Sequence, residues 1–275
     1  MTTPEHESSR TNVQHETLEH ICTVTLKTTT MTPAFFGEIE SLFDAIEQDD
    51  DIRVVIIRSE ERAFCYGLDL AQAFKEKGHL LAGKGTAGPR TELLKMIRRW
   101  QRAFSVVDQC RVPVIAAIHG WCIGGGLDLI SAADMRLCSE DARFSLREAR
   151  IAIVADLGSL QRLPPIIGQG HTRELAYTAG DIDAARAEEI GLVNHVFSDK
   201  ESLDAAASAM AKEIAANPPL AVQGTKNVLN HDRGKTVEEG LTYVGTWNAA
   251  FLQSDDLAEA ISAFLSKRTP EFKGK

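Results

Sequence analysis

The feature that most constrains the fold is a glycine triplet that follows a short apolar segment near the middle of the chain. Val114–Ile118 is an unbroken run of apolar residues, which is typical of a buried strand. Gly124, Gly125 and Gly126 come shortly after it, and the next residues, Leu-Asp-Leu-Ile, have helical character. The triplet therefore predicts a turn from a strand into a helix, where the absence of Cβ atoms lets a ligand approach the backbone closely.

This predicted turn is suited to stabilising negative charge. The first amide groups of a helix have no intrahelical acceptor and lie at the positive end of the helix dipole. They can donate to an oxyanion that develops on a carbonyl oxygen. Three acidic residues follow the turn, namely Asp128, Glu148 and Asp156. The combination points to proton transfer beside a polarised carbonyl group.

Each of these features also has a purely structural interpretation. A glycine triplet alone is more often a packing device than a catalytic one. Glu148 alone is typical of a surface acid, Asp156 before Leu-Gly-Ser fits a helix N-cap, and Asp128 in a first turn complements the helix dipole. The triplet is neither a dinucleotide fingerprint nor a phosphate loop, because G-x-G-x-x-G and Gly-Lys-Ser/Thr are both absent.

Composition narrows the class of protein. A formal net charge of −9 argues against a general nucleic-acid or anionic-membrane surface, and an apolar content of 44% in 275 residues suffices for one substantial core. The five cysteines include no C-x-x-C, and no apolar run approaches the ~20 residues that span a bilayer. We therefore expect reduced thiols, no metal site, no membrane insertion and a cytoplasmic location.

The chain divides into three parts by pattern. Residues 1–19 are polar without periodicity and are predicted to be a disordered tail. Residues 20–199 alternate predicted strands and helices in strand–strand–helix order, and residues 200–275 are predicted to form a helical domain. Strands are expected at 21–26, 52–57, 114–118 and 192–197, and long helices at 33–48 and 91–110.

Two segments have compositions that break regular structure. Residues 75–90 hold four glycines and three lysines, which predicts a mobile loop, either disordered or a functional lid. Further on, Pro164-Pro165 is expected to interrupt the helical pattern, which leaves short helices at 158–167 and 172–179.

Three segments together resemble the crotonase (enoyl-CoA hydratase/isomerase) superfamily. They are RAFCYGLDL at 62–70, PVIAAIHGWCIGGGLDLISAADMRL at 113–137 and GLVNHVF at 191–197, and the resemblance covers residues 20–267. Within the superfamily, SLREARIAIVADLGSLQRLPPIIG at 145–168 is similar to the Δ3,5-Δ2,4-dienoyl-CoA isomerase subgroup. Typical hydratases are expected to carry Glu in place of Asp128 and no acid in place of Asp156. The segment KTTTMTPA at 27–34 departs from the Arg-Pro and Asn-Ala of many members.

The resemblance implies an α/β fold, a crotonase-like spiral of ββα units with a C-terminal α-helical domain. It implies an acyl-CoA thioester as the ligand and no cofactor, because coenzyme A is part of the substrate. It also implies self-association into trimers or hexamers, and leaves open which of the two forms.

The resemblance assigns roles to particular positions. The backbone N–H groups of Leu68 and Gly125 match the oxyanion-hole donors. Glu148 and Asp156 are expected to be the acid/base pair, and Asp128 is expected to be a third acid that helps or tunes them. The positions expected to bind the substrate or coenzyme A are Arg62, Ala63, Cys65, Tyr66, Gly67, Leu68, Asp69 and Gly125.

Three functions fit these expectations. The first is isomerisation of a 3,5-dienoyl-CoA to its 2,4-isomer, with protons carried by carboxylates. The alternative is an enoyl-CoA hydratase in which Asp128 and Glu148 hold a water for addition to a 2-enoyl-CoA. A third is a non-catalytic acyl-CoA binder that keeps the fold.

Overall fold

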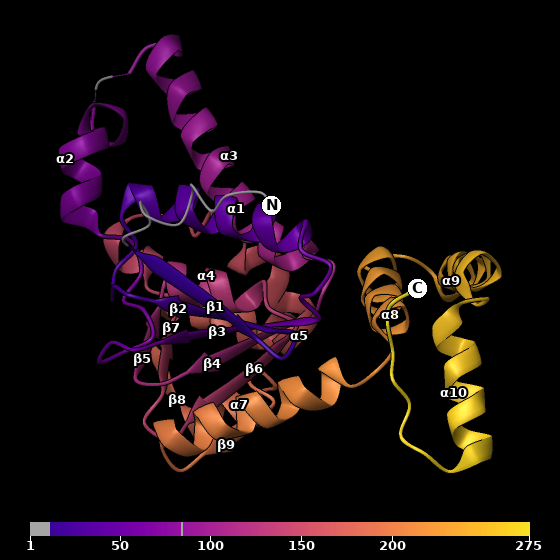
Figure 1. Cartoon of the computed structure of the whole chain (residues 1–275). Helices are drawn as coiled ribbons and strands as arrows, with labels where there is room; N and C mark the ends of the chain where they lie inside the picture. Colours follow the sequence, from indigo (N-terminus) through magenta and orange to yellow (C-terminus); the bar gives the residue numbers. More distant parts are fainter. Residues whose placement is uncertain (1–11, 84) are drawn as a thin grey trace, which may run out of the picture.

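The structure is a computed structural model that describes residues 12–83 and 85–275. It is a mixed α/β molecule in which two sheets are enclosed by helices, and the last three helices stand to one side (Figure 1). The spiral of strands and helices with a C-terminal helical part confirms the predicted fold class. No helix in the described part of the chain is long and apolar enough to cross a membrane.

The main sheet has six strands in the order β1-β2-β3-β4-β6-β9, of which only β1 and β2 pair antiparallel. Its strands are β1 (Val13–Leu18), β2 (Ile21–Leu26), β3 (Val54–Ser59), β4 (Val114–Ile118), β6 (Met135–Ser139) and β9 (His195–Phe197). A smaller sheet contains β5 (Trp121–Ile123), β7 (Arg143–Ser145) and β8 (Asp181–Asp183).

The helices cover both faces of the main sheet, except for the last three, which stand to one side of it. In chain order they are α1 (Pro33–Glu47), α2 (Leu70–Leu81), α3 (Ala87–Gln109), α4 (Gly125–Ser131), the 3-10 helix η2 (Glu148–Ile151), α5 (Ser159–Thr178), α6 (Ala184–Glu189), α7 (Lys200–Ala215), α8 (Pro219–His231), α9 (Val237–Phe251) and α10 (Asp255–Ser266).

The core lies on both sides of the main sheet. On one side α1 packs on α3, where the rings of Phe36 and Trp100 stack with centroids 4.6 Å apart. On the other side α7 places Leu203 and Ala207 against residues of β3, β4 and β6. Because both faces are covered, β4 is apolar throughout, as its sequence indicated.

The prediction of disorder up to residue 19 is wrong for residues 13–18, because they form β1. This strand pairs antiparallel with β2 at the edge of the main sheet. Val13 is buried whereas Leu18 is exposed, so an edge strand of this kind shows no clear apolar alternation. Glu38 secures its start by accepting hydrogen bonds from the backbone and side-chain nitrogens of Asn12, at 2.8 and 2.6 Å. Residues 1–11 of the predicted tail lie outside the described residues.

The prediction of a loop over 75–90 is also wrong, because α2 continues to Leu81 and α3 begins at Ala87. Asp69 caps α2 by accepting a hydrogen bond from the Gln72 amide at 2.8 Å. The Ala, Gln, Lys and Leu residues of this segment favour a helix, and one glycine in a helix costs only about 1 kcal/mol. Local propensity therefore outweighs the glycine content here.

The interruption in α5 lies at Gly168 and not at the two prolines. Pro164 and Pro165 are both inside the helix, whereas Gly168 has a φ of 80° and a ψ of 161°. A proline removes a backbone donor but keeps a helical φ, whereas a positive φ breaks the helical path.

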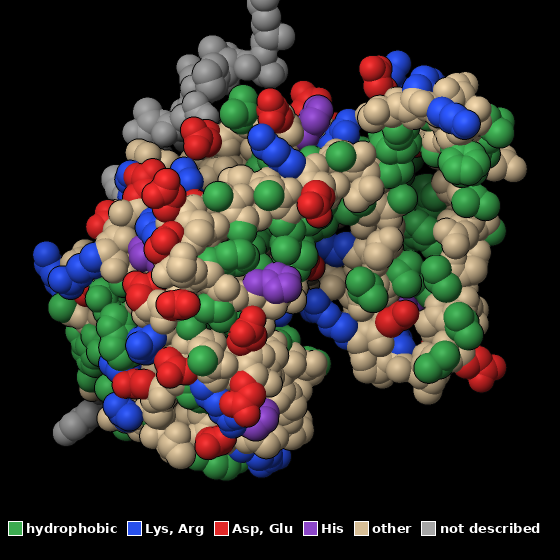
Figure 2. Space-filling model, turned by 90° about the horizontal axis from the view of Figure 1, so that it is seen from below, with side chains coloured by type: hydrophobic (Ala, Val, Ile, Leu, Met, Phe, Trp, Pro, Cys, Tyr) green, Lys and Arg blue, Asp and Glu red, His purple; other side chains and the backbone are tan. Residues whose placement is uncertain are grey.

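The C-terminal helices are tied to the core at a few polar points. By its contacts α7 belongs with the sheet, so the helices that stand apart begin at α8 (Figure 1). Lys226 of α8 is buried and donates to the carbonyl of Val112 at 2.9 Å and to Asp134 at 2.6 Å. A cavity of about 920 Å³ separates α8 from α5, and Figure 2 shows the molecule hollowed between the core and these helices.

Candidate active site

The glycine triplet forms the predicted turn into a helix, with one short strand, β5, immediately before it. Gly124 has a φ of 53°, and α4 begins at Gly125. Gly67, which has a φ of 85°, lies directly against this turn. A Cβ atom on Gly67 would be 2.9 Å from the carbonyl oxygen of Ile123 and 3.3 Å from the nitrogen of Gly125. Only glycine fits there, so two distant motifs of the sequence meet at this point.

Two backbone amides lie close together at this contact. A Cβ atom on Gly125 would be 3.8 Å from the nitrogen of Leu68, and neither the Leu68 nor the Gly125 N–H donates a hydrogen bond to another group of residues 12–83 and 85–275. The position of the segment is secured by Cys65, which exchanges hydrogen bonds of 2.9 Å with Trp121 and Ile123. Two unused donors of this kind can bind a carbonyl oxygen that gains negative charge.

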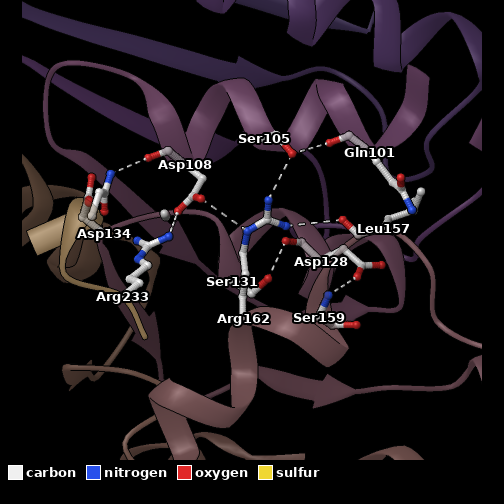
Figure 3. A network of polar contacts seen from close by, with 12 residues as sticks. Gln101, Ser105, Asp108, Asp128, Ser131, Asp134, Leu157, Ser159, Arg162 and Arg233 are labelled. Carbon is white, nitrogen blue, oxygen red and sulfur yellow. Dashed lines mark hydrogen bonds and ion pairs between the residues drawn. The ribbon is translucent and has the colours of Figure 1, made fainter. Parts of the chain in front are cut away.

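Asp128 lies in α4 and is 1% exposed. Its Oδ1 accepts a hydrogen bond of 2.7 Å from the backbone nitrogen of Ser159, so it connects α4 to the first residue of α5 (Figure 3). Burial, with a smaller contribution from the charge of Asp156, raises the pKa of Asp128 to about 6, against the opposing hydrogen bonds from Ser159. The position of Asp128 in the first turn of α4 agrees with a favourable interaction with the helix dipole. That interaction does not explain the burial of Asp128 or its coupling to Asp156.

Glu148 is directed at the glycine turn. A Cβ atom on Gly124 would be 3.1 Å from Oε1 of Glu148, so the missing side chain makes room for this carboxyl group. Its Oε2 is buried and has no hydrogen-bond partner among the described residues. Burial, followed by the charges of Asp128 and Asp156, raises the pKa of Glu148 to about 7. A buried carboxyl with an unused oxygen and this pKa is suited to proton transfer near neutral pH.

Asp156 lies in the loop of residues 152–158, which we call the catalytic loop. Gln101 of α3 donates a hydrogen bond of 2.7 Å to the Asp156 backbone carbonyl, and burial raises the pKa of the Asp156 carboxyl. The N-cap of α5 is Gly158, which has no side chain to cap the helix, so the capping interpretation of Asp156 is wrong. Its carboxyl is therefore not used in ending or starting a helix.

A local turn brings the separated acids together. Seven residues lie between Glu148 and Asp156, and the chain reverses at Ala152, which has a φ of 60°. The backbone nitrogen of Ile153 then donates to the carbonyl of Glu148 at 3.0 Å. The charges of Asp128 and Asp156 raise the pKa of Glu148, and the charge of Asp156 raises that of Asp128, so the three acids form one coupled cluster.

The residues predicted to contact coenzyme A differ in exposure. Arg62 is exposed, with its guanidinium carbon 5.5 Å from the centre of the Tyr66 ring. Ala63 and Cys65 are buried. Asp69 has a structural task, because it caps α2. Arg62 is thus the exposed member of this set, and Tyr66, Leu68 and Asp69 are half-buried.

Other reactive residue types near the site have structural surroundings. His119 is buried, and its Nε2 lies 2.8 Å from the carbonyl oxygen of Glu61, so it is a partnered core histidine. Burial raises the pKa of Cys65 to about 12 and that of Cys122 well above its usual value, which keeps both as thiols. Within the described ranges, no group of three or more His, Cys, Asp or Glu residues could hold a metal ion.

Sequence reasoning missed the residues that support the acids. Gln101, Ser159 and Arg162 contact the catalytic loop or Asp128 from α3 and α5. Nothing in their sequence positions sets them apart, because the contacts depend on how α3, α4 and α5 pack. Of the residues that accommodate the acids, only Gly124 stands out in the sequence, where it is a member of the glycine triplet.

Comparisons with known proteins agree with this geometry. A family model described as enoyl-CoA hydratase/isomerase matches residues 16–275. A mitochondrial Δ(3,5)-Δ(2,4)-dienoyl-CoA isomerase of Dictyostelium discoideum is 47% identical over 242 residues, which are 87% of this chain and 81% of the relative. A peroxisomal dienoyl-CoA isomerase of Arabidopsis thaliana is 46% identical and covers 86% of each chain. A solved enoyl-CoA hydratase from Bacillus anthracis is 29% identical, with a TM-score of 0.87 over 96% of this chain and 100% of that one.

The names of these relatives correct one expectation. The sequence predicted a cytoplasmic location, whereas the dienoyl-CoA isomerases of Dictyostelium discoideum and Arabidopsis thaliana are named mitochondrial and peroxisomal. The cytoplasmic prediction is therefore wrong. It rested on the cysteine pattern and on the lack of a long apolar run, and neither distinguishes the cytoplasm from the interior of an organelle.

Proposed function

The chain belongs to the enoyl-CoA hydratase/isomerase family, and on that basis we propose that it isomerises a 3,5-dienoyl-CoA to the 2,4-dienoyl-CoA. The observation that carries the proposal is the cluster of three coupled carboxyl groups, one buried and two half-buried, beside two unused backbone amides. Hydration needs acids near one double bond only, whereas this isomerisation needs proton exchange at two carbons that lie far apart. The relatives at 46% and 47% identity are named for the isomerisation.

The thioester oxygen is held by the N–H groups of Leu68 and Gly125. Removing a proton from C2, the carbon next to the thioester, places negative charge on this oxygen as an enolate. Donors that are already in position stabilise that charge, and loss of one such donor typically costs on the order of 10²–10³ in rate. The short separation of Gly67 from Gly125 supports this assignment.

Glu148 is proposed to remove the C2 proton, since its Oε1 lies against Gly124, next to the oxyanion donor Gly125. The C2–H bond breaks and its electrons form a C2=C3 double bond. The C3=C4 electrons shift to form C4=C5, and the C5=C6 electrons become available to bind a proton at C6. Asp156 then donates a proton to C6, which completes the 2,4-diene. Substrate and product are isomers, so the reaction neither gains nor loses atoms or electrons. It therefore requires no cofactor besides the coenzyme A of the substrate.

Asp128 is proposed to tune the pair without exchanging protons with the substrate. Its Oδ1 is already used by the Ser159 amide, and its charge raises the pKa of Glu148. For the acyl chain, we propose contact with the exposed apolar residues between the two acids, namely Ile151, Ile153 and Val154. For coenzyme A, the exposed Arg62 is the proposed phosphate contact, supported by its cation–π contact with Tyr66.

The direct test is a spectrophotometric assay with a 3,5-dienoyl-CoA. The conjugated 2,4-dienoyl product absorbs where the substrate does not, so we expect rapid growth of its absorbance. An enoyl-CoA hydratase would instead convert a 2-enoyl-CoA to a 3-hydroxyacyl product that carries solvent oxygen. A non-catalytic binder would turn over neither thioester. Hydration without isomerisation would reject the proposal and reduce Asp156 to a structural residue.

The activity should depend on pH as a bell, because the reaction needs one acid and one base in the same cluster. Glu148, with a pKa raised to about 7, must be ionised to act as the base, and Asp156, whose pKa burial also raises, must be protonated to act as the acid. At low pH protonation of Glu148 blocks the base, and at high pH Asp156 has no proton to deliver. We expect kcat/KM to peak near neutral pH and to fall on both sides by up to about tenfold per unit.

A second variant checks the assignment of the acidic limb. Asp128→Asn should move that limb to lower pH, because the charge of Asp128 raises the pKa of Glu148, the base, and its removal lets Glu148 stay ionised at lower pH. The amide can still accept the Ser159 hydrogen bond, so the fold is preserved. A profile that stays level from about pH 5 to 9 would contradict a reaction driven by these carboxyl groups.

We also propose self-association into trimers or hexamers. It is supported by apolar side chains that α9 and α10 expose, namely Val237, Leu241, Phe251, Ile261, Phe264 and Leu265. Exposed apolar patches of this extent mark protein–protein contacts. Light scattering at micromolar concentration should give three or six times the mass of one chain, and a monomer would contradict the proposal.

A further inference from the structure

A polar network runs from the C-terminal helices to the catalytic loop, and its centre is Asp108 at the end of α3 (Figure 3). Asp108 is 16% exposed and lies between two arginines. Nη1 of Arg233, just after α8, is 2.6 Å from its Oδ1, and Nε of Arg162, in α5, is 3.8 Å from its Oδ2. One carboxylate therefore holds two guanidinium groups from different parts of the chain.

Arg162 continues the network to the catalytic loop. Its Nη1 donates to the carbonyl of Leu157 at 3.4 Å, and its Nη2 donates to Ser105 of α3 at 3.3 Å. A Cβ atom on Gly158 would be only 1.8 Å from Nη1 of Arg162, so the guanidinium fills the space that this glycine leaves open. Arg162 is thus packed against the backbone of the two residues that follow Asp156.

The other end of the network secures the C-terminal helices. Besides the Arg233 ion pair, Asn230 of α8 donates to the backbone carbonyl of Asp108 at 3.1 Å. The Arg233–Asp108 pair is the shorter of the two ion pairs of Asp108, and it keeps the carboxylate from turning away from Arg162. A carboxylate shared between two guanidinium groups couples their positions.

We propose that Arg162 is a positioning residue that holds the catalytic loop in place for proton transfer. The position of Arg162 in turn depends on the docking of α8 through Arg233 and Asp108. The inference rests on the proposed isomerase function. Arg162 does not need to touch the substrate: it fixes the Leu157 carbonyl, and Leu157 follows Asp156 directly. Gln101 fixes the Asp156 carbonyl from the opposite helix, so the loop is held from two sides.

The test is a double-mutant cycle on kcat with Arg162→Gln and Arg233→Gln. Arg162→Gln should lower kcat by on the order of tenfold to a hundredfold, because small displacements of a catalytic group cost this much. KM should change by less than about twofold, since the thioester oxygen is held by Leu68 and Gly125, which lie outside the loop. Arg233→Gln should give a smaller loss in kcat, and the double variant should be no worse than Arg162→Gln alone.

The chain offers a matched control. Arg102 also pairs with an acid, Glu40 of α1, at 2.6 Å, but its side chain is exposed and pairs with α1 instead of the loop. Arg102→Gln removes the same charge and should leave kcat and KM unchanged. Additive losses in the double variant would overturn the coupling, and an unchanged kcat in Arg162→Gln would overturn the positioning role.

A readout besides activity separates this inference from the proposed function. Amide hydrogen exchange of residues 155–159 should become faster in Arg162→Gln and in Arg233→Gln, but not in Arg102→Gln. If the wild-type chain is inactive but the variants show this exchange pattern, the isomerase function is rejected and the positioning network is retained. An active wild-type chain whose exchange is identical in all variants would reject the network and keep the isomerase.

Discussion

Replacing Glu148 by Gln or Asp156 by Asn is expected to lower kcat for the 3,5-dienoyl-CoA by between about 10² and 10⁴. Each amide keeps the shape of the carboxyl but can neither remove nor deliver a proton. Glu148 has a buried, unpartnered Oε2, so the substitution does not remove a hydrogen bond of that atom within the described residues. The loss should therefore appear in kcat, with a smaller effect on KM.

The two variants should differ in a partial reaction, which tests the proposed division of roles. In deuterated water, Asp156→Asn should still exchange the C2 proton of the substrate, because Glu148 and the oxyanion donors remain. Glu148→Gln should exchange neither C2 nor C6. The reverse pattern would show that the assignments of the two acids must be swapped, and full turnover by Asp156→Asn would contradict its role altogether.

Glu201→Gln is the matched control for these substitutions. Glu201 is an exposed acid in the first turn of α7, on the sheet face away from α1 and α3. Its replacement removes the same charge without changing the carboxyl cluster, so turnover should be unchanged. A comparable loss in this control would mean that net charge, and not proton transfer, explains the effect.

Replacing Gly67 by Ala is expected to lower kcat/KM by on the order of 10²–10³, the cost of losing one oxyanion donor. The new Cβ would lie 2.9 Å from the Ile123 carbonyl oxygen, which is backbone and cannot rotate away. The φ of 85° is strained for alanine as well. Relief of both requires a shift of residues 67–68, which moves the Leu68 N–H away from the Gly125 N–H.

Gly170→Ala is the control for a glycine replacement as such. Gly170 lies in α5, and a Cβ atom there would have no neighbour within 4 Å. This variant should be as active as the wild type and slightly more stable. Circular dichroism and thermal unfolding of Gly67→Ala should show a folded chain. A folded Gly67→Ala with full activity would contradict the proposed oxyanion site.

The periodicity of the sequence predicted those elements that have a buried apolar face. β2, β4 and α1 lie within a residue of the predicted bounds, because burial of one face imposes a visible pattern on the residues. β1 and α2 were missed because their stability depends on other forces. β1 is held by pairing at a sheet edge, and α2 by helix propensity and an N-cap.

The sequence by itself determined the family, the glycine turn and the three acids, because these are properties of residue type and spacing that the motifs carry. Only the tertiary structure decided which acids couple and what supports them. The contact of Gly67 with Gly125, the room that Gly124 leaves for Glu148, and the hold of Arg162 on the catalytic loop all join segments that are far apart in sequence. Such contacts depend on how the helices pack on the sheet, and no local pattern encodes them.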